Sequence, residues 1–266
     1  MADAVLYDVS DGLATITLNR PEAMNAMNVE AKVALRDAAR AAAADEAVRA
    51  VLLTATGKAF CVGQDLKEHV ALLAAAAESG SRDVMTTVRE HYNPIVEALA
   101  GMAKPVVAGV NGVAAGAGLG FALAADHRIV ADTATFTTSF AGVALTADSG
   151  VSWTLPRLVG PSRAADLLLF PRSFGAQEAY DWGIANRVVP AAELHAEAEK
   201  AARALAAGPT LAYAALKESL AYGAAHSLTE SLAKEEELQS RAGASEDHAI
   251  AVKAFLAKER PAYVGR

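Results

Sequence analysis

The sequence predicts an α/β protein in which strands and helices alternate in layers. Residues 13–18 alternate apolar and polar side chains, which is typical of a half-buried strand. Residues 106–110 are small and apolar, as in a fully buried strand, and a glycine-rich segment that opens a helix follows them. Because such strand–helix–strand units occur twice, layered α/β packing is expected.

The first unit runs from the strand at 13–18 to a second strand at 51–53, where the chain is again apolar. Between these strands, apolar residues recur at helical spacing: Ala31, Leu35, Ala38 and Ala42. We expect a helix with this face turned to the sheet.

The second unit begins at Pro105 and ends with a strand at 127–131. Between Asn111 and Asp126 lies the longest uncharged apolar run, which contains four glycines. This run is shorter than the roughly 20 residues that a membrane helix needs. A buried helix is therefore expected here.

The last part of the chain is predicted to be mainly helical. After residue 149, helical periodicity dominates, with one further short strand at 187–189. Ser227 and Glu230 have the spacing of a capping box. The composition changes near residue 205, so we expect a core over 1–204 and a helical region over 205–266.

An apolar stripe marks one face of the predicted last helix. Its members are Ala249, Val252, Phe255 and Leu256. We expect the stripe to belong to the core, and packing on another subunit is the alternative.

The composition excludes several classes of protein. The chain has 266 residues, 53% hydrophobic and 21% charged, with a mean hydropathy of +0.21 and a net charge of −7. A chain of about 300 residues buries roughly three-quarters of its unfolded surface, so one large globular domain is expected rather than disorder. The acidic balance repels phosphate and anionic lipid, so neither nucleic acid nor a membrane is an expected partner.

The start of the chain lacks the charged and apolar regions of a signal peptide, so a cytoplasmic location is expected. Cys61 is the only cysteine and cannot form an internal disulfide. No Cys/His spacing resembles a zinc site, and no two histidines form an H-x-x-x-H pair. We therefore expect no metal.

Three segments stand out as candidates for chemistry: residues 58–66, 111–120 and 147–150. Each lies where a strand or loop leads into a predicted helix. Backbone N–H groups at the start of a helix lack intrahelical partners and carry the positive end of its dipole. Such a turn can bind an anion or a developing oxyanion.

Gln64 and Ala117 each follow a glycine in the first two segments, and their backbone amides are candidate donors. Asp148, in the third segment, is a candidate acid or base. Taken singly, a glycine turn is often only tight packing, and Asp65 or Asp148 before a helix is by default an N-cap.

Two other catalytic classes fit poorly. The spacing Gly116-x-Gly118-x-Gly120 differs from the dinucleotide fingerprint G-x-G-x-x-G, and no acidic residue follows where a ribose partner belongs. The serine-nucleophile motif G-x-S-x-G is absent.

Together, the three segments resemble the crotonase (enoyl-CoA hydratase/isomerase) superfamily, and the resemblance covers nearly the whole chain. It implies a spiral of β-β-α units, of the kind called ClpP/crotonase-like, with a helical C-terminal region. Within the superfamily, the chain most resembles the ring-1,2-epoxyphenylacetyl-CoA isomerases of phenylacetate degradation, with Δ3,Δ2-enoyl-CoA isomerases as close relatives. The segments that carry this finer resemblance are 63–66, 92–94, 111–118, 148–150 and 155–157.

The resemblance implies an acyl-CoA substrate whose thioester oxygen lies between two backbone N–H groups, here those of Gln64 and Ala117. Fixed donors stabilise a developing enolate oxygen without reorganisation. Because the backbone makes these bonds, the identity of the Gln64 side chain is expected to matter little. The implied substrate- and CoA-binding residues are Met24, Gln64, Asp65, Leu66, Lys67 and Gly116. CoA is part of the substrate, so no separate cofactor is expected.

The chain departs from the hydratase pattern at both acid/base positions. Hydratases carry one glutamate three residues after the second amide donor and another in the following loop. Gly120 and, by an ungapped count, Phe140 stand at these places. Neither can transfer a proton, so addition of water lacks its acid and its base.

Asp148 instead matches the single carboxylate of the epoxide-isomerase group. One carboxylate suffices for an isomerase, since the proton taken from one carbon can be returned to another. Phe136, Phe140 and the apolar loop are expected to keep the pocket dry, which would raise the pKa of Asp148.

We therefore expect an acyl-CoA isomerase that acts on ring-1,2-epoxyphenylacetyl-CoA or, as second choice, on a 3-enoyl-CoA of fatty acid metabolism. A hydratase with an atypical acid/base and a non-catalytic acyl-CoA-binding homologue are the alternatives. As in the family, the helical C-terminal region is expected to form homotrimers that can pair into hexamers. Residues 69–92 are the expected specificity segment.

Overall fold

The computed structural model describes residues 3–79 and 85–266, and its larger sheet follows the order β1-β2-β3-β5-β7-β10. Neighbouring strands are parallel except for the antiparallel pair β1 and β2. The strands are β1 (Val5–Ser10), β2 (Leu13–Leu18), β3 (Ala50–Ala55), β5 (Val106–Val110), β7 (His127–Ala131) and β10 (Arg187–Val189). Every residue of β3 and β5 is buried, which explains why both read as continuous apolar runs.

The smaller sheet has the order β4-β6-β8-β9 and carries the segments of interest at its strand ends. Its strands are β4 (Ala59–Cys61), β6 (Val113–Ala115), β8 (Thr135–Thr137) and β9 (Phe174–Gly175). The β4–β6 and β6–β8 pairs are parallel, and β9 closes the sheet in the antiparallel sense.

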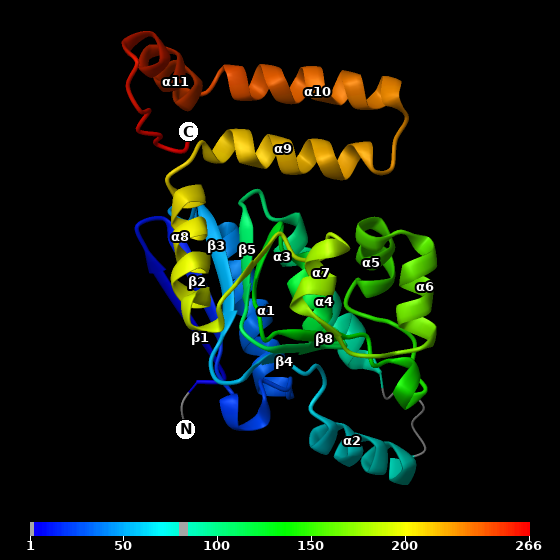
Figure 1. Cartoon of the computed structure of the whole chain (residues 1–266). Coiled ribbons are helices and arrows are strands. Elements are labelled where there is room, and N and C mark those ends of the chain that lie inside the picture. The colour runs from blue at the N-terminus through cyan, green and yellow to red at the C-terminus, as the bar shows by residue number, and fades with distance from the viewer. Residues whose placement is uncertain (1–2, 80–84) are drawn as a thin grey trace.

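The first turn of the chain gives β1 and β2 to the larger sheet, and the next three turns each give one strand to each sheet before a helix follows, which confirms the predicted spiral of β-β-α units. The alternation of strands and helices can be followed in Figure 1. Thus β5 joins the larger sheet, β6 joins the smaller one, and helix α4 follows. The helices are α1 (Val29–Ala44), α2 (Leu66–Ser79), α3 (Asn93–Gly101), α4 (Ala117–Ala124), α5 (Val151–Val159), α6 (Pro161–Leu169), α7 (Ala176–Asp181), α8 (Leu194–Ala206), α9 (Thr210–Gly223), α10 (Leu228–Gly243) and α11 (Glu246–Ala257).

Helix α1 matches its predicted periodicity, because the four apolar residues of the pattern are all buried. The Asn28 side chain caps its start by accepting a hydrogen bond from the amide of Ala31 at 3.0 Å. At its other end, the Lys104 ammonium donates to the carbonyl oxygen of Ala42 at 2.7 Å.

The segment between Asn111 and Asp126 is only partly helical, so its prediction as one buried helix was wrong. Strand β6 precedes α4. A Cβ at Gly112 would lie 2.0 Å from the Lys58 carbonyl oxygen, so the chain needs glycine where it passes the start of β4. Alanine-rich runs fit either a buried strand or a helix, and β6 and β9 are too short for a periodic signal.

Helices α9, α10 and α11 extend beyond the sheets (Figure 1). The predicted capping box is confirmed, since the Ser227 hydroxyl accepts from the Glu230 amide and the Glu230 carboxylate accepts from the Ser227 amide. The expected burial of the last stripe was wrong. Phe255 is 82% exposed and Leu256 76% exposed, because α11 buries Asp247 and Ala254 instead.

Within residues 3–79 and 85–266, no helix combines the length and the apolar character that crossing a bilayer requires.

Candidate active site

Parallel pairing of β4 with β6 brings the first two glycine turns together. Cys61 lies opposite Ala114, and the carboxyl ends of both strands meet at the same edge of the sheet. A Cβ at Gly63 would lie 2.9 Å from the Ala115 oxygen and 3.3 Å from the Ala117 nitrogen. The two turns are therefore in backbone contact, and Gly63, with φ of +83°, is the residue that permits it.

The backbone amides of Gln64 and Ala117 are the two candidate donors. Met27 forms a short bridge with the first turn: its N–H donates to the Gly63 oxygen at 2.7 Å, and its oxygen accepts from Asp65 at 3.1 Å. The N–H of Gln64 takes no part in this bridge. The N–H of Ala117 opens α4 and has no intrahelical acceptor. Neither amide bonds to another group in the part of the chain that the structure describes.

Cys61 fills the space beneath the two turns. A Cβ at Gly118 would lie 2.1 Å from the Cys61 oxygen, so α4 packs directly on the end of β4. Burial raises the pKa of the Cys61 thiol to about 12. The thiol is therefore neutral near pH 7 and is no candidate for a nucleophile.

Asp148 lies half-buried on the turn before α5. Its interpretation as an N-cap is wrong, because α5 begins at Val151 and its N-cap, Gly150, is not assisted by any side chain. The Asp148 carboxylate instead accepts a hydrogen bond from the Ser149 hydroxyl at 2.8 Å. Burial raises the pKa of Asp148 and outweighs this hydrogen bond, which lowers it.

The turn that holds Asp148 packs against the helix that Ala117 opens. A Cβ at Gly120 would lie 2.5 Å from both the Cβ and the carbonyl oxygen of Ser149. The backbone therefore occupies the space that a glutamate side chain at position 120 would need, and α4 and this turn are held in one arrangement.

Tyr92 forms a hydrogen bond with the first turn and lies within the electrostatic influence of Asp148. Its side chain is 2% exposed, and its hydroxyl donates to the side-chain oxygen of Gln64 at 2.5 Å. Burial and then the negative charge of Asp148 raise the pKa of Tyr92. Tyr92 was predicted only as the end of the specificity segment 69–92 and as part of the resemblance, and no chemical role was predicted for Ser149. The short π-helix Val88–Tyr92 was the missing signal, since such segments often mark functional sites but leave no periodic pattern in a sequence.

The predicted CoA-binding residues lie around the start of α2. Asp65 is an N-cap: its carboxylate accepts from the Lys67 and Glu68 amides and pairs with Arg20 at 3.1 Å. Burial alone would raise the pKa of Asp65, but these donors outweigh it and keep the pKa below its ordinary value.

The side chains next to Asp65 face outward. Met24 is 54% exposed and Leu66 62% exposed, and Lys67 is also exposed. Gly116, with φ of +52°, forms the N-cap of α4. The expected specificity segment 69–92 lies partly outside the described residues.

The two phenylalanines expected to dry the pocket differ in position. A Cβ at Gly116 would lie 3.9 Å from the Phe140 ring, so Phe140 borders the second turn. Phe136 is buried in β8 and stacks on Phe174, with ring centroids 5.5 Å apart. Phe136 therefore belongs to the packing behind the smaller sheet.

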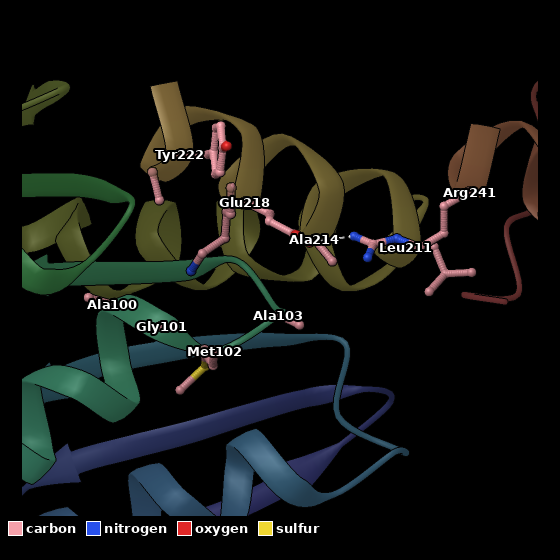
Figure 2. Close-up of a pocket in the computed structure, with 11 residues that line it drawn as sticks. Ala100, Gly101, Met102, Ala103, Leu211, Ala214, Glu218, Tyr222 and Arg241 are labelled. Carbon is pink, nitrogen blue, oxygen red and sulfur yellow. Dashed lines mark hydrogen bonds and ion pairs between the residues drawn. The ribbon is translucent and has the colours of Figure 1, made fainter. Parts of the chain in front are cut away.

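A separate cavity of about 650 Å³ lies between the end of α3 and helices α9 and α10 (Figure 2). Figure 2 shows Met102 and Ala103 on one side and Glu218 and Tyr222 of α9 on the other. The Arg241 guanidinium pairs with Glu218 at 2.6 Å. None of the predicted site residues lines this cavity.

Comparisons with known proteins find full-length similarity to enoyl-CoA hydratases and isomerases. A probable enoyl-CoA hydratase of Rhodobacter capsulatus is 41% identical over 98% of both chains. The 1,2-epoxyphenylacetyl-CoA isomerase of Escherichia coli strain K12 is 37% identical over 100% of both chains. A solved structure from Mycobacterium abscessus, provisionally named enoyl-CoA hydratase/isomerase, has a TM-score of 0.95 and 47% identity over 99% of this chain and 100% of that one. The family model for enoyl-CoA hydratase/isomerase matches residues 8–266, and the chain belongs to this family, the crotonase superfamily.

Proposed function

We propose that the protein is an acyl-CoA isomerase that moves a proton on a thioester enolate. In this proposal, the amides of Gln64 and Ala117 bind the thioester oxygen and Asp148 carries the proton. One observation carries the proposal: the two free amides lie on contacting turns, and the turn with Asp148 packs on the helix that Ala117 opens.

The proposed proton transfer balances with a single carboxylate. Asp148 takes a proton from C2 of a 3-enoyl-CoA, and the electron pair moves to the thioester oxygen, where two N–H groups stabilise its charge. The protonated carboxyl then returns the proton to C4, which leaves a 2-enoyl-CoA. Because burial raises its pKa, the Asp148 carboxylate is a stronger base than an exposed one.

Ring-1,2-epoxyphenylacetyl-CoA is the proposed first substrate, with a 3-enoyl-CoA as the second. The full-length similarity to the Escherichia coli 1,2-epoxyphenylacetyl-CoA isomerase supports this order. In the epoxide, Asp148 would assist ring opening and expansion to the seven-membered oxepin thioester. Met24, Asp65, Leu66, Lys67 and Gly116 are proposed to border the CoA moiety, which is part of the substrate, so no further cofactor is needed.

Hydration of a 2-enoyl-CoA is the second candidate, since the 41% identical Rhodobacter capsulatus relative is named a probable enoyl-CoA hydratase. The packing at Gly120 argues against it, because no acid/base side chain fits there. Loss of conjugated-thioester absorbance from a 2-enoyl-CoA would indicate hydration. Gain of that absorbance from a 3-enoyl-CoA would indicate isomerisation.

The test of the proposal is Asp148→Asn, which keeps the shape of the side chain but removes its ability to carry the proton. We expect kcat to fall at least about a hundredfold, as is typical of a lost general acid/base, while acyl-CoA affinity changes little. A panel of acyl-CoA thioesters that includes the aromatic epoxide supplies the substrates. Unchanged turnover in this variant would refute the assignment, and tight binding without turnover by the wild type would identify a non-catalytic homologue.

We further propose a homo-oligomer, a trimer or a dimer of trimers, formed through the C-terminal helices. Large apolar side chains remain exposed on α9, α10 and α11, and the cavity beside α9 lies open next to them. The most exposed are Leu220, Leu228, Phe255 and Leu256. A cytoplasmic location stays a prediction, supported by the composition with one cysteine.

A further inference from the structure

We propose that Tyr92 and the side chain of Gln64 form a positioning pair that holds the first amide donor in place. The inference rests on the proposed function, in which the N–H of Gln64 binds the thioester oxygen. It also revises the expectation that the Gln64 side chain matters little.

The hydrogen bond between the two side chains is short and half-buried. The Tyr92 hydroxyl donates to the Gln64 oxygen at 2.5 Å, and only 2% of Tyr92 is exposed. Without this donor, the carboxamide oxygen would have to find water or remain unpaired, which is costly where it is shielded from solvent. The pair therefore favours one orientation of Gln64.

The peptide that carries the Gln64 N–H is also anchored through the backbone. Its carbonyl group, that of Gly63, accepts a hydrogen bond from the Met27 N–H at 2.7 Å, and a planar peptide fixes the N–H relative to that carbonyl. The Gln64 side-chain nitrogen reaches the Asp65 oxygen at 3.4 Å. The Tyr92 hydroxyl therefore adds a second anchor, which restrains the residue from its side chain.

Tyr92, in contrast, is rigidly placed. Its ring packs on Phe121 with centroids 6.0 Å apart, and the buried Lys32 ammonium lies 5.5 Å from the ring centroid. Lys32 is itself held by the Thr87 hydroxyl at 3.0 Å and by Glu68 at 3.4 Å. These contacts join α1, α2 and the π-helix behind the tyrosine, so its hydroxyl is a fixed point.

The hydroxyl also keeps its proton. Burial and the charge of Asp148 raise the pKa of Tyr92, so the phenol stays neutral and remains a donor wherever Asp148 is ionised. Tyr92 is thus a positioning residue that acts through Gln64.

The experiment compares Tyr92→Phe, Gln64→Met and the double variant, with Tyr180→Phe on α7 as the matched control, since Tyr180 is 51% exposed. The first readout is the infrared carbonyl frequency of bound phenylacetyl-CoA labelled with ¹³C at the thioester carbon. Hydrogen bonds from the amides lower this frequency. The second readout is kcat and KM with the substrate that the panel identifies.

We expect each single variant to lose part of the frequency shift and to lower kcat about tenfold, the effect of one half-buried hydrogen bond, with little change in KM. The kcat of the double variant should be no lower than that of the less active single variant, because each single substitution already removes the hydrogen bond between the two side chains. The control should match the wild type.

Full kcat and a full frequency shift in Tyr92→Phe would overturn the inference, even if its thermal unfolding midpoint fell, and so would the absence of a shift in the wild type. If the wild type shows the shift but turns over no acyl-CoA, the proposed function fails. In that case the inference about the positioning pair is still supported if Tyr92→Phe reduces the infrared frequency shift.

Discussion

Asp148 is costly for the folded state because it is a half-buried carboxyl with no cationic partner among the described residues. Burial raises its pKa above the ordinary value of 3.8. The folded state therefore binds this proton more tightly than the unfolded state does. The stabilisation that comes from this tighter proton binding is present at acid pH. It is lost as the pH rises from the ordinary pKa of an aspartate through the raised pKa of Asp148.

Asp148→Asn is therefore expected to raise the free energy of unfolding near pH 7 while it abolishes turnover. The advantage over the wild type should shrink as the pH falls through the raised pKa of Asp148 and then through the ordinary value of 3.8, below which the carboxyl becomes neutral in both states. Urea unfolding between about pH 3 and pH 8 measures this difference in the free energy of unfolding. Asp166→Asn, at an exposed position on α6, is the matched control, and a stability gain of Asp148→Asn that is the same at every pH would contradict the explanation.

Single residues were predictable from the sequence where their chemistry depends on local chain order. Gln64 and Ala117 follow glycines at the ends of strands, and such turns are visible in the sequence. The contact between Tyr92 and Gln64 was not predictable, because it joins residues far apart in the chain through the packing of α1, α2 and the π-helix. The hydrogen bond from Ser149 to Asp148 depends on a backbone turn with φ of +51° that no pattern signals.

At the scale of elements, the contact between α4 and the turn before α5 determines which acid/base positions are possible. Gly120→Ala is expected to destabilise the fold by about 1–3 kcal/mol, because its Cβ would meet the Ser149 backbone. Gly120→Glu should destabilise it further and give no hydratase activity.

Gly243→Ala at the end of α10 is the control for the Gly120 variants, since no atom lies within 4 Å of the added Cβ. It should be neutral or stabilise by up to about 1 kcal/mol. Urea unfolding measures the stability of the Gly120 variants and of the control, and a 2-enoyl-CoA absorbance assay measures their hydratase activity. A stable Gly120→Glu protein that hydrates its substrate would show that the turn can move aside.

Elements with strong periodicity were predicted well, and short ones were not. Helix α1 and strand β2 lie where their periodic patterns put them, and β5 lies where its continuous apolar run put it. Strands β6 and β9 have three and two residues, so their pairing partners define them and not their own composition.

At the scale of the whole molecule, the apolar surface of the C-terminal helices is expected to hold the oligomer together. The double substitution Phe255→Ser and Leu256→Ser should reduce the mass in solution, as sedimentation velocity measures, without loss of helical circular dichroism. Leu169→Ser on α6, which is 69% exposed, is the matched control and should leave the mass unchanged. If only the control dissociates the assembly, the subunits meet through the core instead.

The order of strands in the larger sheet has a consequence for biosynthesis. Each strand pairs with the one that the ribosome delivered before it to this sheet, from β1 through to β10. The sheet can therefore grow at one edge while translation continues, and no later segment has to insert between strands already joined. The last helices emerge when this scaffold exists, so the proposed association with other copies would follow as a late, concentration-dependent event.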